Sequence, residues 1–211
     1  EIQKIYPQEE SQLAYVWREY MPSDRYDCGN IDFCNDGDKL HSIKTLEDFM
    51  SEKILLIDGH SILNRAFYGL PDLTNSEGKH TGAVYGFLNI LLRTIEEEKP
   101  QYLTVAFDLK APTFRHKMFE AYKGTRKPMP EELREQVPLI KEMLTAMGVN
   151  VVTKEGYEAD DILGTLARKS EAAGMDATIL SGDRDLLQLA TDKVMIRLPK
   201  TVRGKTTIED Y

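Results

Sequence analysis

Apolar and polar positions along the chain form alternating blocks that predict strands and helices in turn. The apolar runs predicted as strands are Lys53–Ile57, Tyr102–Phe107, Val149–Val152 and Ala177–Leu180. The blocks with helical spacing are Thr81–Glu98, Glu131–Met147, Ala159–Ala173 and the short Asp185–Ala190. Strands that are apolar throughout are typical of a parallel sheet buried on both faces. We therefore predict an α/β fold, with a mostly parallel twisted sheet and helices on both faces.

Proline and glycine refine these elements. Pro138 interrupts the block 131–147, so two short helices or a kink are expected there. Gly82 and Gly86 lie on an otherwise apolar helix and predict close helix packing. The segments 194–198 and 206–208 are predicted to form a last pair of strands.

The chain changes character near residue 50. Residues 1–49 hold both cysteines and carry five basic against eleven acidic side chains, whereas residues 50–211 carry 22 against 24. The first 49 residues also show no sustained helical or strand period. We expect residues 1–49 to be an extension outside the fold and residues 50–211 to form the domain. No apolar run reaches the roughly 18 residues that cross a bilayer, so a cytoplasmic protein is expected.

Acidic side chains follow three of the predicted strands. Asp58 and Asp108 come directly after a strand, and Asp183 follows another after Ser181 and Gly182. The carboxyl ends of parallel strands meet at one edge of a sheet, where open α/β folds bind ligands, so these carboxylates are expected to converge. The further acids expected at this edge are Glu158, Asp160, Asp161 and Asp185.

Seven converging carboxylates would repel one another and oppose folding unless cations lie among them. The candidate ligands are all hard oxygens, which favours Mg²⁺ or Mn²⁺ over Zn²⁺. Two such ions can activate a water and stabilise a leaving oxygen. Taken singly, each acid also fits a helix cap, a dipole partner or a solvated turn. Relief of repulsion predicts that Asp161→Asn costs little stability.

Basic and aromatic residues alternate between residues 114 and 127. The cations are Arg115, Lys117, Lys123, Arg126 and Lys127, with Phe119 and Tyr122 between them. This pattern is typical of a groove that holds single-stranded nucleic acid without reading its sequence. Arg115, Tyr122 and His60 are predicted to contact substrate. Lys123 and Arg126 are predicted to contact a phosphate of the bound strand and, as catalytic residues, to stabilise any charge that develops on it.

Five motifs resemble those of the 5′ nuclease domain of bacterial DNA polymerase I, a family related to flap endonucleases. They are Ile57-Asp-Gly-His-Ser61, Ala106-Phe-Asp-Leu-Lys-Ala-Pro-Thr-Phe-Arg-His116, Tyr122-Lys-Gly-Thr-Arg126, Gly156-Tyr-Glu-Ala-Asp-Asp161 and Ser181-Gly-Asp-Arg-Asp-Leu186. The resemblance runs from about Met50 to the chain end. It implies a PIN-like fold with a helical arch, and the removal of 5′ flaps and RNA primers in replication and repair. It also implies that the seven acids bind the metal.

The resemblance has consequences for partners. It implies DNA with 5′ flaps or nicks and RNA–DNA hybrids as substrates, no membrane, a monomer, and a polymerase fused after this domain. The family continues with a further acidic motif and a helix-hairpin-helix-like module, and this sequence stops before both. We therefore expect this chain to bind DNA weakly and to cut it poorly.

Three other functions are weighed against this one. A PIN-like ribonuclease, such as a toxin, would lack the long basic insertion at 110–147. A non-catalytic nucleic-acid-binding domain would be expected to have lost carboxylates, and all those expected in this span are present. A phosphatase with an aspartyl nucleophile would need a second Asp after the first strand, where His60 stands.

Overall fold

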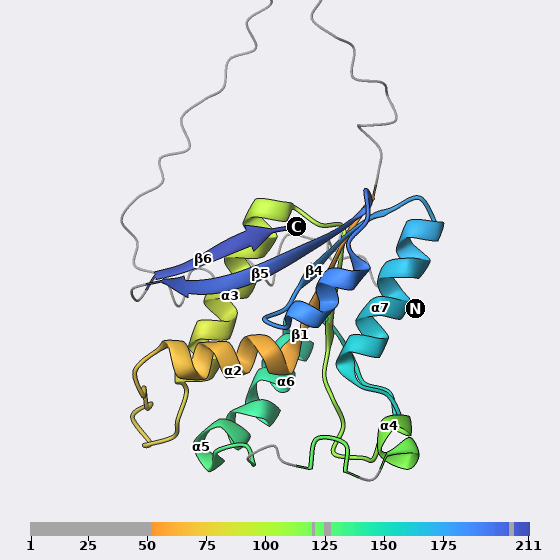
Figure 1. The fold of residues 1–211 in the computed structure, drawn as a ribbon. Helices are drawn as coiled ribbons and strands as arrows, with labels where there is room; N and C mark the ends of the chain where they lie inside the picture. Colours follow the sequence, from red (N-terminus) through yellow and green to blue (C-terminus); the bar gives the residue numbers. More distant parts are fainter. Residues whose placement is uncertain (1–51, 120, 125–127, 203–204) are drawn as a thin grey trace, which may run out of the picture. The chain divides into compact units, whose positions relative to one another are not determined.

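The structure is a computed structural model that describes residues 52–119, 121–124, 128–202 and 205–211. The predicted extension 1–49 and the predicted catalytic Arg126 lie outside these residues. A six-stranded sheet forms the centre of the described part, in the order β3-β2-β1-β4-β5-β6 (Figure 1). Its strands are β1 (Lys53–Asp58), β2 (Tyr102–Ala106), β3 (Asn150–Val152), β4 (Asp176–Leu180), β5 (Val194–Val202) and β6 (Lys205–Asp210).

The sheet is parallel except at one edge. β1 pairs in parallel with β2 on one side and with β4 on the other, with Leu56 opposite both Thr104 and Ile179. β3 and β5 extend the parallel arrangement, and β6 alone runs antiparallel, beside β5. The predicted mostly parallel sheet and the predicted final strand pair are both confirmed.

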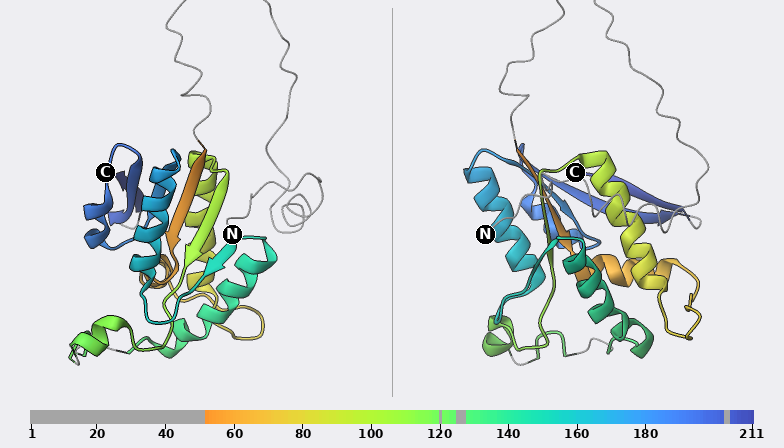
Figure 2. Two further views of the ribbon diagram at one scale, coloured as in Figure 1. Left: turned by 90° about the vertical axis from the view of Figure 1, so that its right-hand side faces the viewer. Right: turned by 180° about the vertical axis from the view of Figure 1, so that it is seen from behind.

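Helices cover both faces of the sheet (Figure 2). On one face α2 (Gly59–Gly69), α3 (Gly82–Glu98) and α6 (Gln136–Ala146) pack against side chains such as Leu55 and Val105. On the other face α7 (Ala159–Ala172) and the 3₁₀ helix η1 (Arg184–Leu189) pack against Ile54 and Leu56. Successive residues of β1 thus enter different cores, because side chains of a strand alternate between its two faces.

Two helical details differ from the sequence prediction. Helix α2 was not predicted, although Asp58 gives it a normal N-cap by accepting a hydrogen bond from Ser61 N–H at 3.0 Å. The block 131–147 divides into α5 (Glu131–Arg134) and α6 at Glu135, before Pro138. Pro138 is the third residue of α6, where the absent N–H removes no helical hydrogen bond, so the proline is tolerated.

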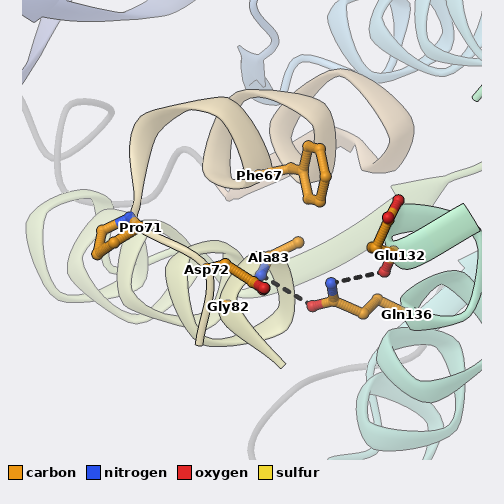
Figure 3. Close-up of a pocket in the computed structure, with 7 residues that line it drawn as sticks. All are labelled: Phe67, Pro71, Asp72, Gly82, Ala83, Glu132 and Gln136. Carbon is orange, nitrogen blue, oxygen red and sulfur yellow. Dashed lines mark hydrogen bonds between the residues drawn. The ribbon is translucent and has the colours of Figure 1, made fainter. Parts of the chain in front are cut away.

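The start of α3 is capped by a side chain from a distant helix. Gln136 is 1% exposed, and its Oε1 accepts hydrogen bonds from Ala83 N–H at 2.8 Å and Val84 N–H at 3.2 Å. Its Nε2 donates to the Glu132 carbonyl at 2.9 Å (Figure 3). This amide satisfies backbone donors that a helix start leaves unpaired. The adjoining cavity of about 270 Å³ is lined by none of the residues predicted for the site.

Close packing of α2 on α3 depends on a glycine. A Cβ at Gly86 would lie 2.9 Å from Ala66 Cβ and 2.8 Å from Leu70 Cδ1, which confirms the predicted close approach. No helix in the described ranges is both long and apolar enough to cross a bilayer.

Candidate active site

Three neighbouring strands carry acids to one edge of the sheet. Asp58 ends β1, Asp108 lies two residues beyond β2, and Asp183 lies three residues beyond β4. Because β2, β1 and β4 are adjacent and parallel, their carboxyl ends lie together. Asp160 reaches the same edge from the first turn of α7, where Asp58, Asp183 and Asp108 all raise its pKa by repulsion. We call Asp58, Asp108, Asp160 and Asp183 the acidic cluster.

Asp58 is the most buried member of the cluster, at 6% exposed. Its Oδ1 accepts from Ser61 N–H, and its Oδ2 accepts from the Ser181 hydroxyl, each at 3.0 Å. Burial raises the pKa of Asp58 from 3.8 to about 6, although these two hydrogen bonds oppose the rise. The negative charges of Asp108 and Asp183 add to it.

Asp160 has a higher pKa than Asp58. Burial raises it from 3.8 to about 7, with smaller contributions from the other three carboxylates. Asp108 is tied to the same helix, because its Oδ1 accepts a hydrogen bond from Ala159 N–H at 2.7 Å. Within the described part of the chain, no lysine or arginine forms an ion pair with any member of the cluster. The cluster therefore carries a charge that a bound cation would neutralise.

Glu158 and Asp161 have different surroundings. Arg115 donates two hydrogen bonds of 2.7 Å to Asp161, one to each carboxylate oxygen. Glu158 accepts from Lys123 Nζ at 2.8 Å and from the Tyr122 hydroxyl at 3.1 Å. Both acids also form a capping box at the start of α7. These hydrogen bonds join the basic segment after β2 to the acidic start of α7.

The expectation that Asp161→Asn relieves repulsion is wrong. Hydrogen bonds from Arg115 lower the pKa of Asp161, so its charged form is stabilised in the folded protein. Its Oδ2 also accepts from Glu158 N–H at 2.9 Å. Repulsion by neighbouring acids raises the pKa of Asp58 and of Asp160 instead.

Asp185 and His60 lie at the border of the cluster. Asp185 is exposed, and its N–H donates to Asp183 Oδ1 at 2.9 Å, so Asp183 caps η1. His60 Nδ1 accepts from Asp108 N–H at 3.2 Å, which holds the loop after β2. Burial lowers the pKa of His60. Its predicted contact with substrate stays a prediction.

The segment between β2 and α5 supplies the basic side of the site. It begins with α4 (Phe114–Met118), which lies beside the N-terminal end of α7 (Figure 1). Lys123 follows in a turn and has φ +56°, a left-handed conformation that is uncommon for a residue other than glycine. We call Phe114–Gly124, without the undescribed residue 120, the arch segment. It is the described part of the predicted helical arch.

A cleft of about 790 Å³ runs between the arch segment, α7 and η1. Its lining includes Arg115, Tyr122 and Lys123 on the basic side and Asp160 and Asp183 on the acidic side. A cleft with cations, a phenol ring and carboxylates can hold a phosphate chain and a metal ion beside each other.

The donor set fits a divalent metal by its chemistry. All four members of the cluster offer carboxylate oxygens, the ligands that Mg²⁺ and Mn²⁺ prefer. As they stand, no three Asp, Glu, His or Cys side chains among the described residues come close enough to enclose an ion. Magnesium ordinarily takes only one or two carboxylates directly and keeps several waters, so an open cluster suits it.

Two serines were missed in the sequence. Ser181 is fully buried, donates to Asp58 and accepts from Asp183 N–H at 3.0 Å. Ser61 Oγ accepts from Gly182 N–H at 2.9 Å. These hydroxyls tie the end of β1 to the loop after β4. The only sequence signal was a serine next to an expected ligand, which is too common to be informative.

Comparison with known proteins places these features in one family. Residues 53–211 match the family described as 5′-3′ exonuclease, N-terminal resolvase-like domain. The chain is 49% identical over 160 residues to DNA polymerase I of Bacillus subtilis (strain 168), which covers 76% of this chain and 18% of the relative. It is 45% identical over 148 residues to the thermostable DNA polymerase I of Thermus thermophilus, with 70% and 18% covered.

A solved structure agrees with the fold. The bacteriophage T5 D15 flap endonuclease, crystallised as a pseudo-enzyme-product complex with DNA and metal ions, matches with a TM-score of 0.54 at 22% identity. The match covers 69% of this chain and 54% of that one. This likeness confirms the predicted flap-endonuclease type of α/β fold. The chain spans only 18% of the length of the polymerases that it matches. The family match over residues 53–211 shows that this chain belongs to the 5′-3′ exonuclease N-terminal domain family.

Proposed function

We propose that this chain is the metal-binding part of a 5′-3′ exonuclease or flap endonuclease that hydrolyses phosphodiesters of DNA. The observation that carries the proposal is the acidic cluster, in which four carboxylates lack ion pairs with lysine or arginine in the described structure and adjoin a basic cleft. Such an arrangement suits a divalent cation on one side and a phosphate chain on the other.

The residues have separate roles in this proposal. Asp58, Asp108, Asp160 and Asp183 would hold the metal, with Glu158, Asp161 and Asp185 at its border. Bound Mg²⁺ or Mn²⁺, as two ions, would activate a water and stabilise the leaving oxygen. Arg115, Lys123 and Arg126 would bind phosphates, and Tyr122 would stack on a base. We expect products with a 5′-phosphate and a 3′-hydroxyl.

The substrate and context are part of the same proposal. We expect 5′ flaps, nicks and RNA primers as substrates, in replication and repair. The T5 flap endonuclease complex with DNA supports DNA as a substrate, and the polymerase relatives support a polymerase in the same natural chain. A monomer, a cytoplasmic location, and the division into an extension 1–49 and a domain 50–211 stay predictions of the sequence.

The test is cleavage of a 5′-labelled flap DNA by the 211-residue chain in Mg²⁺ or Mn²⁺. The mutant to compare is Asp108→Asn, because asparagine keeps an oxygen that can accept from Ala159 N–H and loses the charge. Asp192→Asn is the matched control, since Asp192 is exposed and precedes β5 at the opposite edge of the sheet.

We expect cutting near the flap junction that Asp108→Asn abolishes and Asp192→Asn leaves unchanged. Equal cutting by Asp108→Asn would exclude the acidic cluster as the catalytic centre. Products with a 3′-phosphate would show that the bond from phosphorus to O5′ breaks, and would contradict the proposed loss of O3′ as the leaving oxygen.

A further inference from the structure

A lysine on α6 approaches the acidic cluster from the face of the sheet opposite to α7. Lys141 Nζ lies 4.7 Å from the ring centroid of Phe107, the residue that directly precedes Asp108. Phe107 is fully buried, and His60 meets its ring edge to face with the centroids 5.2 Å apart. The ammonium is therefore held over a fixed aromatic face, a favourable cation–π position.

Lys141 is within electrostatic reach of the cluster. The negative charge of Asp108 acts on its ammonium, and the charge of Lys141 in turn acts on His60. Lys141 is half-buried, and burial lowers its pKa. The ammonium thus interacts electrostatically with Asp108 over a longer distance than an ion pair, and its partial burial carries a desolvation cost.

No carboxylate forms an ion pair with this ammonium in the described structure. Arg115 and Lys123 form short ion pairs, whereas Lys141 Nζ has neither an ion pair nor a hydrogen bond to any described residue. A partly desolvated cation without an anionic partner is unfavourable unless an anion joins it. Phosphate is the anion that the proposed nuclease function would bring to this edge of the sheet.

We propose that Lys141 binds a phosphate of the nucleic-acid substrate, on the other side of the acidic cluster from Arg115 and Lys123. This inference rests on the proposed nuclease function and adds a contact to it. The substrate backbone would then pass between two sets of cations, with the arch segment and α7 on one side and α6 on the other.

The test is the salt dependence of binding to a 5′-flap DNA by the 211-residue chain, with Ca²⁺ replacing Mg²⁺ to keep the DNA intact. Each lost phosphate contact lowers the slope of log K against log salt by about 0.7 to 0.9. Lys141→Gln should show that decrease and bind roughly eightfold more weakly at 0.1 M salt, the factor that a slope of 0.9 gives between 0.1 M and 1 M. Lys141→Arg should restore the slope.

Lys193→Gln is the matched control, because Lys193 is exposed and directly precedes β5 at the opposite edge of the sheet. It should leave the slope unchanged. If wild type and Lys141→Gln bind with equal slopes, Lys141 is only a counterion of Asp108 and the inference is wrong, while the nuclease function stands. If the wild-type chain neither binds nor cuts the flap DNA, the proposed function fails and the inference fails with it.

Discussion

Carboxylates only one residue apart in sequence have opposite electrostatic surroundings in this site. Asp161 is paired with Arg115, which lowers its pKa, whereas burial and three other acids raise the pKa of the adjacent Asp160 to about 7. Successive side chains of a helix point in different directions, so Asp161 faces the arch segment and Asp160 faces the strand ends. The sequence does not distinguish these two acids, but in the structure Asp161 has a structural role and Asp160 is a candidate metal ligand.

Asp160→Asn should stabilise the metal-free protein at pH 8. The pKa of Asp160 is raised in the folded state, so its charged form costs stability, and that cost grows as the pH rises from 3.8 to about 7. We expect a gain of about 1–2 kcal/mol at pH 8, after allowance for solvent screening, and little gain at pH 4. Urea unfolding in EDTA at both pH values measures it.

The matched control for this mutation is Asp192→Asn, at an exposed acid at the other edge of the sheet. It should change stability by less than about 0.5 kcal/mol at either pH. An Asp160→Asn protein that is less stable than wild type at pH 8 would show that Asp160 is paired and not repelled.

Ser181→Ala should weaken metal binding through Asp58. The mutation removes the hydroxyl that donates to Asp58 and leaves Asp183 N–H without its acceptor. Changing a group that orients a metal ligand typically lowers metal affinity by about tenfold or more. Mn²⁺ titration followed by electron paramagnetic resonance measures it. Ser181→Thr should keep most of the affinity, because it keeps the hydroxyl.

Ser170→Ala is the control, since Ser170 is also buried but lies near the far end of α7. Equal Mn²⁺ affinities of Ser181→Ala and Ser170→Ala would show that the Ser181 hydroxyl does not orient a metal ligand.

Helices and strands were predicted correctly where their apolar residues follow one regular period. Strands such as β1 and β4 are mostly apolar between their charged end residues, and their parallel pairing follows from the helices between them. Helix α2 was missed because its apolar positions follow directly on β1, with only Asp58 and Gly59 to mark the change. The break at Glu135 was expected at Pro138, because a proline does not show whether it lies inside a helix or in its first turn.

The contact between the arch segment and α7 could not be predicted from the sequence. Arg115 and Asp161 are 46 residues apart, and nothing local indicates that they pair. The acids at the strand ends could be located in the sequence, but no local pattern indicates that Asp161 and Glu158 pair with cations of the protein itself.

Arg115→Met should loosen the arch segment without unfolding the domain. It removes two short hydrogen bonds to Asp161 while it keeps the apolar stem of the side chain. Because the pair is partly exposed, we expect a loss of about 1–2 kcal/mol. Hydrogen exchange should become faster at Phe119 and Tyr122, whose N–H groups donate within this segment.

Arg134→Met is the control, since Arg134 pairs with Glu131 on the exposed surface of α5. It should leave exchange at Phe119 unchanged. Unaltered protection of the arch segment in Arg115→Met would mean that its own turns hold it in place.

Across the whole chain, the net charge of −8 gave little guidance to function. The fold separates the charges that matter, with acids at the carboxyl ends of β1, β2 and β4 and cations on the arch segment and α6. This segregation follows from topology, which is why the strand order was needed before the charges could be interpreted. A negative chain can still present a basic cleft when a cation neutralises its acidic edge.

Mg²⁺ should raise the melting temperature of the 211-residue chain, and more so at pH 8 than at pH 5.5. Asp58 and Asp160, with pKa values of about 6 and about 7, are largely ionised at pH 8 and largely protonated at pH 5.5, so protons compete with the metal at the lower pH. At a Mg²⁺ concentration 100 times the Kd the gain is about 2.7 kcal/mol. That gain corresponds to roughly 5–10 °C for a chain of this size.

NaCl at equal ionic strength is the control, and Asp58→Asn, which keeps an oxygen to cap α2, should remove most of the effect of Mg²⁺ on the melting temperature. An equal rise with NaCl would show general screening of the negative chain, and an equal rise at both pH values would place the ion away from these two carboxylates.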